Sequence, residues 1–182
     1  MFIGVCGRKG SGKSDIVQFI HEYFISVKTL SYSEPIKQMC KAGYGLSDDQ
    51  LESNKDIIDE RWDKTPRDIM ISTSRCMTFC DDDHWINLMR NRIYGLDISG
   101  VKFIVLSDIR FQNEADLVQE LGGIVINVSK VKEQDPEFAV DDDVTEAYVD
   151  RIDSQFYIEN DGNIDNLKRQ CDRIMFEINK ID

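Results

Sequence analysis

The feature that most constrains the fold is a glycine-rich run near the start of the chain, at residues 7–14, with the sequence GRKGSGKS. It fits the pattern G-x-x-x-x-G-K-[ST] at every fixed position, between an apolar strand-like segment at 2–6 and a helical pattern at about 13–25. Glycines let the backbone wrap so that successive N–H groups converge on a small volume, and the start of the following helix adds positive charge. Such a loop is typical of a phosphate-binding site.

We expect the whole loop to bind the phosphates of a nucleoside triphosphate. Its residues are Gly7, Arg8, Lys9, Gly10, Ser11, Gly12, Lys13 and Ser14. Lys13 is placed to reach the β- and γ-phosphates, and the Ser14 hydroxyl to ligate Mg²⁺. For Arg8 and Lys9, a solvent-exposed place on the loop without a phosphate contact is an equal alternative.

Apolar segments alternate with helical patterns along the chain, which predicts an α/β fold with a parallel sheet flanked by helices. Strands are expected at 2–6, 28–32, 101–106, 124–128 and 156–158. Helices are expected at 13–25, from Pro35, at 47–60, 65–79, 84–94, 112–121 and 163–178, with the aspartates at 81–83 capping the fifth. The start at Thr65 is the clearest, because Thr65 can cap, Pro66 suits the first position and Asp68 completes a capping box.

The charge balance narrows the choice of partners. The chain has 34 acidic residues against 22 Lys and Arg, a net charge of −12. Such a surface repels DNA, RNA and anionic membranes, so we expect neither a nucleic-acid polymer nor a membrane as partner. A small phosphorylated substrate remains compatible, because one local basic pocket suffices. The sequence leaves the oligomeric state open, a homodimer included.

The cysteines and the N-terminus point to a compartment. The five cysteines are odd in number and scattered, which favours free thiols in a reducing cytoplasm. No signal peptide and no membrane-spanning stretch are visible. We therefore expect a cytoplasmic protein, in the host cytoplasm if the chain is viral.

Other classes of P-loop protein fit poorly. A GTPase needs N-K-x-D, which residues 54–57 miss by one position. It also needs D-x-x-G after a strand, whereas the match at 97–100 precedes the strand at 101–106. A motor or helicase needs a larger chain and a surface for a polymer. A small-molecule kinase remains.

A second polar motif, SDIR at residues 107–110, follows what reads as the clearest central strand. Open α/β sheets bind ligands at this end of their strands. Asp108 is expected to hold the metal through water, and Arg110 to bridge the transferred phosphoryl group, so that Lys13, Asp108 and Arg110 are the predicted catalytic residues. The alternative is that Asp108 caps the next helix and Arg110 pairs with Glu114.

Taken together, these motifs resemble those of the bacteriophage-type deoxynucleoside monophosphate kinases. Residues 107–115 are similar to the family's D-V-R-F-x-N-E-A, and the glycine pair at 122–123 follows at the right distance. Residues 33–37 look like A-D-P-L-K, residues 65–67 match T-P-R, and residues 158–162 look like I-x-N-x-G. The resemblance covers nearly the whole chain and implies a P-loop nucleoside monophosphate kinase-like fold.

The resemblance also implies an organisation and an activity. It implies one domain over residues 1–182, with a helical substrate-binding insert at about 35–100 and a lid at about 130–150. The implied reaction is direct, Mg²⁺-dependent transfer of a phosphoryl group from ATP to a deoxynucleoside 5′-monophosphate. The implied substrate-binding residues are Ser33, Lys37, Arg67, Arg75, Arg110 and Arg151.

The reasons for expecting these residues to bind substrate differ from one residue to another. Lys37, Arg67 and Arg110 would bind the substrate phosphate, although a surface salt bridge is the alternative for Lys37 and for Arg67. After T-P-R the family usually continues with a glutamine and then Gly-Thr, whereas this chain has ISTSR at residues 71–75. Arg75 would be a substitute contact to phosphate or base. Arg151 is the arginine nearest to the lid.

The lid region departs from the family. Residues 130–150 hold eight acids and only two bases, and DVTE at 143–146 stands where the family often has H-x-S-E. Phosphate contacts from such a lid should be weak. A catalytically silent nucleotide-binding module is therefore one alternative. A phosphomevalonate kinase-like enzyme is another, because that family shares the Ser-Asp-x-Arg and Glu-Asn-x-Gly motifs.

Two further groups of residues have ordinary explanations. Cys76, Cys80 and His84 would share a face only if one helix ran through all three, so buried thiols are expected rather than a metal site. Trp62 and Trp85 are expected to anchor the core rather than to stack on a base.

Overall fold

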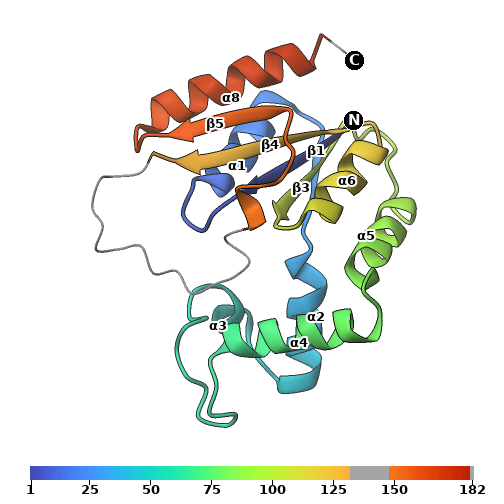
Figure 1. Ribbon diagram of the computed structural model, residues 1–182, viewed down its shortest axis with the longest axis vertical. Helices are drawn as coiled ribbons and strands as arrows, with labels where there is room; N and C mark the ends of the chain where they lie inside the picture. The colour runs from blue at the N-terminus through green and yellow to red at the C-terminus, as the bar shows by residue number, and fades with distance from the viewer. Residues whose placement is uncertain (132–147, 181–182) are drawn as a thin grey trace. The chain divides into compact units, whose positions relative to one another are not determined.

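The computed structural model describes residues 1–131 and 148–180 (Figure 1). A five-stranded sheet has the order β2-β3-β1-β4-β5, and every pair of neighbouring strands is parallel. The strands are β1 (Phe2–Gly7), β2 (Val27–Leu30), β3 (Phe103–Ile109), β4 (Ile124–Lys130) and β5 (Phe156–Asn160). The expected α/β fold with a parallel, helix-flanked sheet is confirmed.

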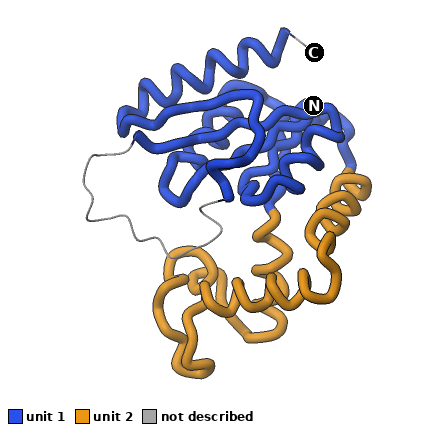
Figure 2. Tube along the Cα trace, in the orientation of Figure 1, with its two compact units in different colours: residues 1–31, 97–182 blue, residues 32–96 orange. Residues whose placement is uncertain are grey.

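The chain divides into two compact units, residues 1–31 with 97–182 and residues 32–96 (Figure 2). The first unit carries the sheet with α1 (Lys13–Tyr23), α6 (Gln112–Glu120) and α8 (Ile164–Ile178). The second unit carries α2 (Ser33–Tyr44), α3 (Asp48–Glu52), α4 (Pro66–Cys80) and α5 (His84–Tyr94). No helix in the described ranges is both long and apolar enough to cross a membrane.

Helices cover both faces of the sheet, which is why its inner strands are continuous apolar runs rather than alternating ones. On one face, α1 and α8 share a core with alternate strand residues. This core contains Ile3, Val5, Ile16, Phe19, Ile20, Phe103, Val105, Ile126, Val128, Ile158, Leu167, Cys171, Ile174, Met175 and Ile178. Gly4 points to the opposite face, where it leaves room for Ile109 and for Val118 of α6.

The centre of the sheet differs from the expectation. The strand expected at 101–106 begins at Phe103 and lies second in the order, whereas β1 is central, between β3 and β4. Both strands are interior, and apolar content alone does not distinguish two interior positions. The glycine-rich loop therefore leaves the middle strand of the sheet.

The second unit has a small core of its own, formed by Cys40, Leu46, Leu51 and Ile69. The capping box of α4 is confirmed, because the Thr65 hydroxyl accepts the N–H of Asp68 at 3.1 Å and the Asp68 carboxylate accepts the N–H of Thr65.

The helix expected at 47–60 is wrong beyond Glu52. The chain turns there around the buried carboxylate of Asp59. That carboxylate accepts hydrogen bonds from the Gln50 amide at 2.7 Å and from the Arg61 backbone N–H at 3.0 Å. These bonds favour a compact turn over a longer helix.

Two expectations near the end of α4 need correction. Cys76 and Cys80 are exposed rather than buried, since the buried residues of α4 lie at its start. The helix breaks after Cys80 and α5 begins at His84, as expected, but Asp83 makes no side-chain capping bond. Within residues 1–131 and 148–180, no three side chains are grouped to bind a metal.

The glycine pair after α6 yields a stability prediction. Gly122 has a φ of +72° in open space, whereas a Cβ on Gly123 would lie 2.6 Å from the Phe2 carbonyl oxygen. At position 122, asparagine tolerates the left-handed backbone conformation. At position 123, the Phe2 backbone cannot move easily to make room for a new methyl group. We expect Gly123→Ala to lower the free energy of unfolding by about 1–3 kcal/mol, and Gly122→Asn by about 1 kcal/mol or less.

Urea denaturation of both variants measures these effects. Equal losses of stability in the two variants would contradict the steric explanation for Gly123.

Candidate active site

The phosphate loop joins the end of β1 to the start of α1. The Lys13 ammonium folds back over the loop and donates hydrogen bonds to the carbonyls of Gly7 at 2.6 Å and Arg8 at 2.7 Å. Gly10 and Gly12 both have positive φ, and a Cβ on Gly10 would meet nothing within 4 Å. The backbone of the loop is thus wrapped and the Lys13 ammonium lies against it, which is the geometry that the motif predicts.

One polar atom of the loop has no partner. The hydroxyl of Ser11 is buried and makes no hydrogen bond to any residue that the structure describes. Buried hydroxyls are normally hydrogen-bonded, so an orphaned one inside an anion-binding motif fits a loop that receives a ligand.

A residue outside the loop supports it. The side-chain amide of Asn160, at the end of β5, donates to the Ser11 carbonyl at 2.9 Å, and its oxygen accepts the N–H of Gly162 at 2.9 Å. A Cβ on Gly12 would lie 2.7 Å from the Asn160 amide nitrogen. Asn160 thus holds the loop from outside. Sequence reasoning noted its motif but assigned it no role.

Asp108 lies within β3, at the same edge of the sheet as the loop. Cys6 of β1 is paired with Ile109, so Asp108 adjoins the point where the loop leaves its strand. The Asp108 carboxylate accepts a hydrogen bond from the Ser31 hydroxyl at 2.7 Å, just beyond β2. Asp108 does not cap α6, because the N-cap residue is Phe111. Ser31 is a neighbour that sequence reasoning missed.

The Glu114 carboxylate fixes the backbone around Arg110. It is buried and accepts the backbone N–H groups of Arg110 at 2.7 Å and Phe111 at 3.2 Å. Burial raises the pKa of Glu114 to about 7, and the charge of Asp108 adds to the rise, while the two N–H groups and the Arg110 charge oppose it. Glu114 thus binds the backbone N–H of Arg110, whereas the alternative weighed from the sequence was a pairing of the two side chains.

The loop's first cation has an acidic partner. The Arg8 guanidinium donates two hydrogen bonds to the Asp150 carboxylate, at 3.0 and 2.6 Å, and both side chains are half-exposed. Lys9 is exposed. Arg151, which follows Asp150 in a turn, is exposed as well. Most of the expected lid at 130–150, including DVTE at 143–146, lies outside the described residues.

The other expected substrate-binding residues all lie on the second unit. Ser33 begins α2, Lys37 lies one turn later, and Arg67 lies in the first turn of α4. Lys37 pairs with Glu52, and Arg67 donates to Asp56 at 2.5 and 3.2 Å. The salt bridges weighed for Lys37 and Arg67 are therefore present.

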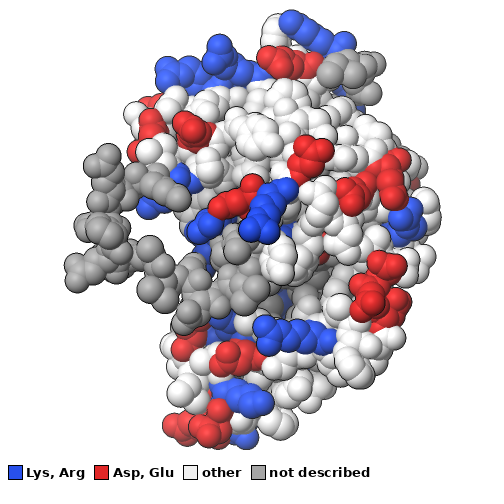
Figure 3. All heavy atoms as spheres, in the orientation of Figure 1, with Lys and Arg blue, Asp and Glu red and all other residues white. Residues whose placement is uncertain are grey.

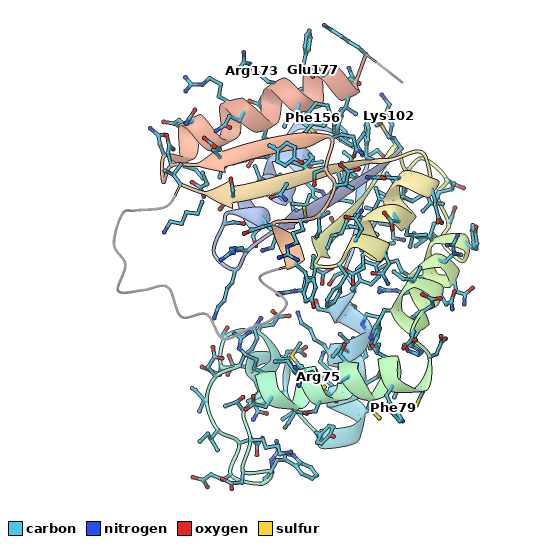
Figure 4. The ribbon with its side chains drawn as sticks, viewed as in Figure 1. Arg75, Phe79, Lys102, Phe156, Arg173 and Glu177 are labelled. Carbon is cyan, nitrogen blue, oxygen red and sulfur yellow. The ribbon has the colours of Figure 1, made fainter. Side chains whose placement is uncertain are left out.

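Arg75 is exposed further along α4 (Figure 4). On the face seen in Figure 3, basic and acidic side chains are interspersed. The expected residues therefore fall into two groups. The phosphate loop at residues 7–14, Asp108, Arg110 and Arg151 belong to the sheet unit, and Ser33, Lys37, Arg67 and Arg75 belong to the helical unit.

A parallel sheet with a phosphate loop after its central strand and an aspartate on the neighbouring strand defines a P-loop kinase fold. Two solved structures share it. Dephospho-CoA kinase from Campylobacter jejuni aligns with a TM-score of 0.54 and 17% identity over 98% of this chain and 97% of that one. TT1252 from Thermus thermophilus aligns with a TM-score of 0.53 and 13% identity over 97% of both chains. These likenesses concern the fold alone.

Sequence comparison is more specific. The model of the deoxynucleotide monophosphate kinase family matches residues 67–171. A protein of Acanthamoeba polyphaga mimivirus described as a deoxynucleotide monophosphate kinase is 31% identical over 145 residues, 71% of this chain and 74% of the relative. The chain belongs to the deoxynucleotide monophosphate kinase family, and it is a phosphotransferase.

The buried carboxylate of Glu114 yields a pH prediction. Its pKa of about 7 in the folded state lies above the ordinary value of 4.5, so the folded state binds more protons in that interval. The contribution of Glu114 to the free energy of unfolding should fall by roughly 3 kcal/mol between about pH 4.5 and pH 7. Glu114→Gln keeps an oxygen acceptor for both N–H groups but cannot titrate, so this fall should disappear.

The measurement is urea denaturation of both proteins across that pH range. Glu177→Gln, an exposed change on α8 (Figure 4), is the control and should keep the wild-type pH dependence. Parallel curves for wild type and Glu114→Gln would contradict the raised pKa.

Proposed function

We propose that this protein transfers the γ-phosphoryl group of ATP to a deoxynucleoside 5′-monophosphate, giving the diphosphate and ADP. The observation that carries the proposal is the arrangement at one sheet edge, where the phosphate loop with Lys13 adjoins Asp108, held by Ser31. Membership of the deoxynucleotide monophosphate kinase family supports the choice of acceptor.

The loop residues would bind the donor. Lys13 would exchange its two carbonyl partners for the β- and γ-phosphates, and the Ser11 hydroxyl would gain an acceptor. The hydroxyl of Ser14 and the carboxylate of Asp108 are oxygen donors of the kind that Mg²⁺ prefers, Asp108 acting through water. Mg²⁺, when bound, offsets negative charge on the phosphates.

The acceptor needs little activation. A phosphate oxygen is already nucleophilic at neutral pH, so positioning and charge neutralisation account for most of the catalysis, without a covalent enzyme intermediate. Arg110, whose backbone Glu114 fixes, would bridge the transferred group. Lys37 and Arg67 would bind the acceptor phosphate, with Ser33 beside them. Arg75 and Arg151 would contact phosphate or base.

An assay of acceptor-dependent ADP release tests the proposal. ATP and Mg²⁺ are supplied with each deoxynucleoside monophosphate, with the matching ribonucleotides and with phosphomevalonate. We expect turnover with at least one deoxynucleoside monophosphate, and Lys13→Ala should abolish most of it. ATP binding without ADP release for any acceptor would indicate a silent nucleotide-binding module, and turnover with phosphomevalonate alone would indicate the other kinase class.

Arg110 gives the sharpest catalytic prediction. A guanidinium offers two oriented hydrogen bonds that an ammonium cannot reproduce, and their value grows as charge shifts in the transition state. We expect Arg110→Lys to lower kcat about a hundredfold or more, with little change in ATP affinity.

The control is Arg173→Lys, an exposed change on α8, which should leave kcat unaltered (Figure 4). Normal turnover in Arg110→Lys, with loss of stability only, would make Arg110 a structural residue.

A further inference from the structure

A third cation lies beside the two that were expected to bind the acceptor phosphate. Lys55 follows α3 in the chain and is partly buried in the second unit. The backbone N–H of Arg67 donates to the Lys55 carbonyl at 3.0 Å, which places the two residues next to each other. In the sequence, Lys55 drew attention only as part of the stretch 54–57 that was compared with the GTPase motif, and it was given no substrate-binding role.

Lys37 is connected to the same part of the chain, because its ammonium pairs with Glu52 at the end of α3, three residues before Lys55. The pKa of Lys55 is lowered, first by burial and then by the positive charges of Lys37 and Arg67. Glu52 and Asp56 oppose this effect. Lys37, Lys55 and Arg67 therefore form one group of three cations, which we call the cation cluster.

The carboxylates that flank the cation cluster are fewer and more exposed than its bases. Glu52 pairs with Lys37 and Asp56 pairs with Arg67, whereas no carboxylate in the described part of the chain is within ion-pair distance of Lys55. The Glu52 and Asp56 side chains are 56% and 69% exposed, against 17% for Lys37. Exposed ion pairs contribute little free energy, so a stronger anion can displace these carboxylates at small cost.

The composition of the cation cluster suits one kind of anion. A terminal phosphate presents three oxygens and nearly two negative charges, which one planar guanidinium and two ammonium groups can share. A carboxylate presents only two oxygens and one charge, and leaves part of the cluster uncompensated. Binding a dianion would also relieve the repulsion among the three bases.

We propose that Lys55 is a third phosphate-binding residue of the acceptor site, and that it binds the 5′-phosphate of a nucleoside monophosphate together with Lys37 and Arg67. This inference rests on the proposed function, because it assigns a further residue to the same substrate. It predicts a contact to the phosphate and none to the base or sugar.

Calorimetric binding to Lys55→Gln tests the contact. The titrants are ATP, the deoxynucleoside monophosphate that gives the highest turnover, and the same deoxynucleoside without its phosphate. We expect the Kd of the monophosphate to rise about tenfold or more, with the Kd values of the deoxynucleoside and ATP unchanged. Lys55→Arg should restore most of the affinity. Lys64→Gln, an exposed lysine of the same unit, should match wild type.

A second readout uses the wild-type protein, so it holds even if Lys55→Gln fails to fold. The NMR titration of the Lys55 ammonium should show its pKa rising when the monophosphate binds, since a dianion then faces it. A purely structural lysine would keep the same pKa.

Failure of the inference and failure of the proposed function are distinguishable. If wild type turns over a deoxynucleoside monophosphate while Lys55→Gln binds it with wild-type affinity, Lys55 is not a ligand and the proposed function stands. An unchanged Lys55 pKa on binding leads to the same conclusion. If wild type phosphorylates no nucleoside monophosphate, both are overturned.

Discussion

The burial of β1 at the centre of the sheet fixes where the chemistry can take place. Its residues pack against α1 and α8 on one face and against α6 on the other, so the strand cannot shift without disturbing both layers. The phosphate loop leaves this strand at Gly7, and β3 runs parallel beside it. Because the carboxyl ends of parallel strands lie at the same edge of a sheet, the strand order alone brings the loop and Asp108 together there.

Hydrogen bonds from side chains then set the details of that edge. Asn160 braces the loop, Ser31 orients Asp108, and Glu114 holds the backbone at Arg110. Each of these partners comes from a strand end or a first helical turn. The phosphate loop, Asp108 and Arg110 are thus all positioned by the sheet unit, which suits a reaction that depends on placement more than on acid–base chemistry.

Much of this could be predicted from the sequence, because the relevant signals are local. The loop motif, the apolar runs of β1 and β3 and the capping box at Thr65 each specify structure over a few residues. The order of the strands could not be predicted, since β1 and β3 are equally apolar. The break after Glu52 depends on the buried Asp59 network, which only the fold assembles.

The same limit applies to the site. Lys13, Asp108 and Arg110 belong to recognisable motifs, whereas Ser31, Asn160 and Lys55 make contacts to residues that are distant in the chain. The motif around Asn160 is visible in the sequence, but its contact with the phosphate loop is not. A lone serine or lysine has no local pattern, so its role emerges only when the partner is known. The spatial neighbours therefore add what the motifs lack, which is the set of groups that orient the candidate catalytic side chains.

The central claim is that the γ-phosphoryl group of ATP is transferred to a deoxynucleoside monophosphate, and isotopic labelling tests this claim most directly. ATP that carries ³²P only at the γ-position is incubated with Mg²⁺, the protein and each of the four deoxynucleoside 5′-monophosphates, and the products are separated. The account predicts that the label appears in the β-phosphate of a deoxynucleoside diphosphate, with one ADP formed for each. Label that stays in ATP or appears only as inorganic phosphate, with every acceptor, would contradict it.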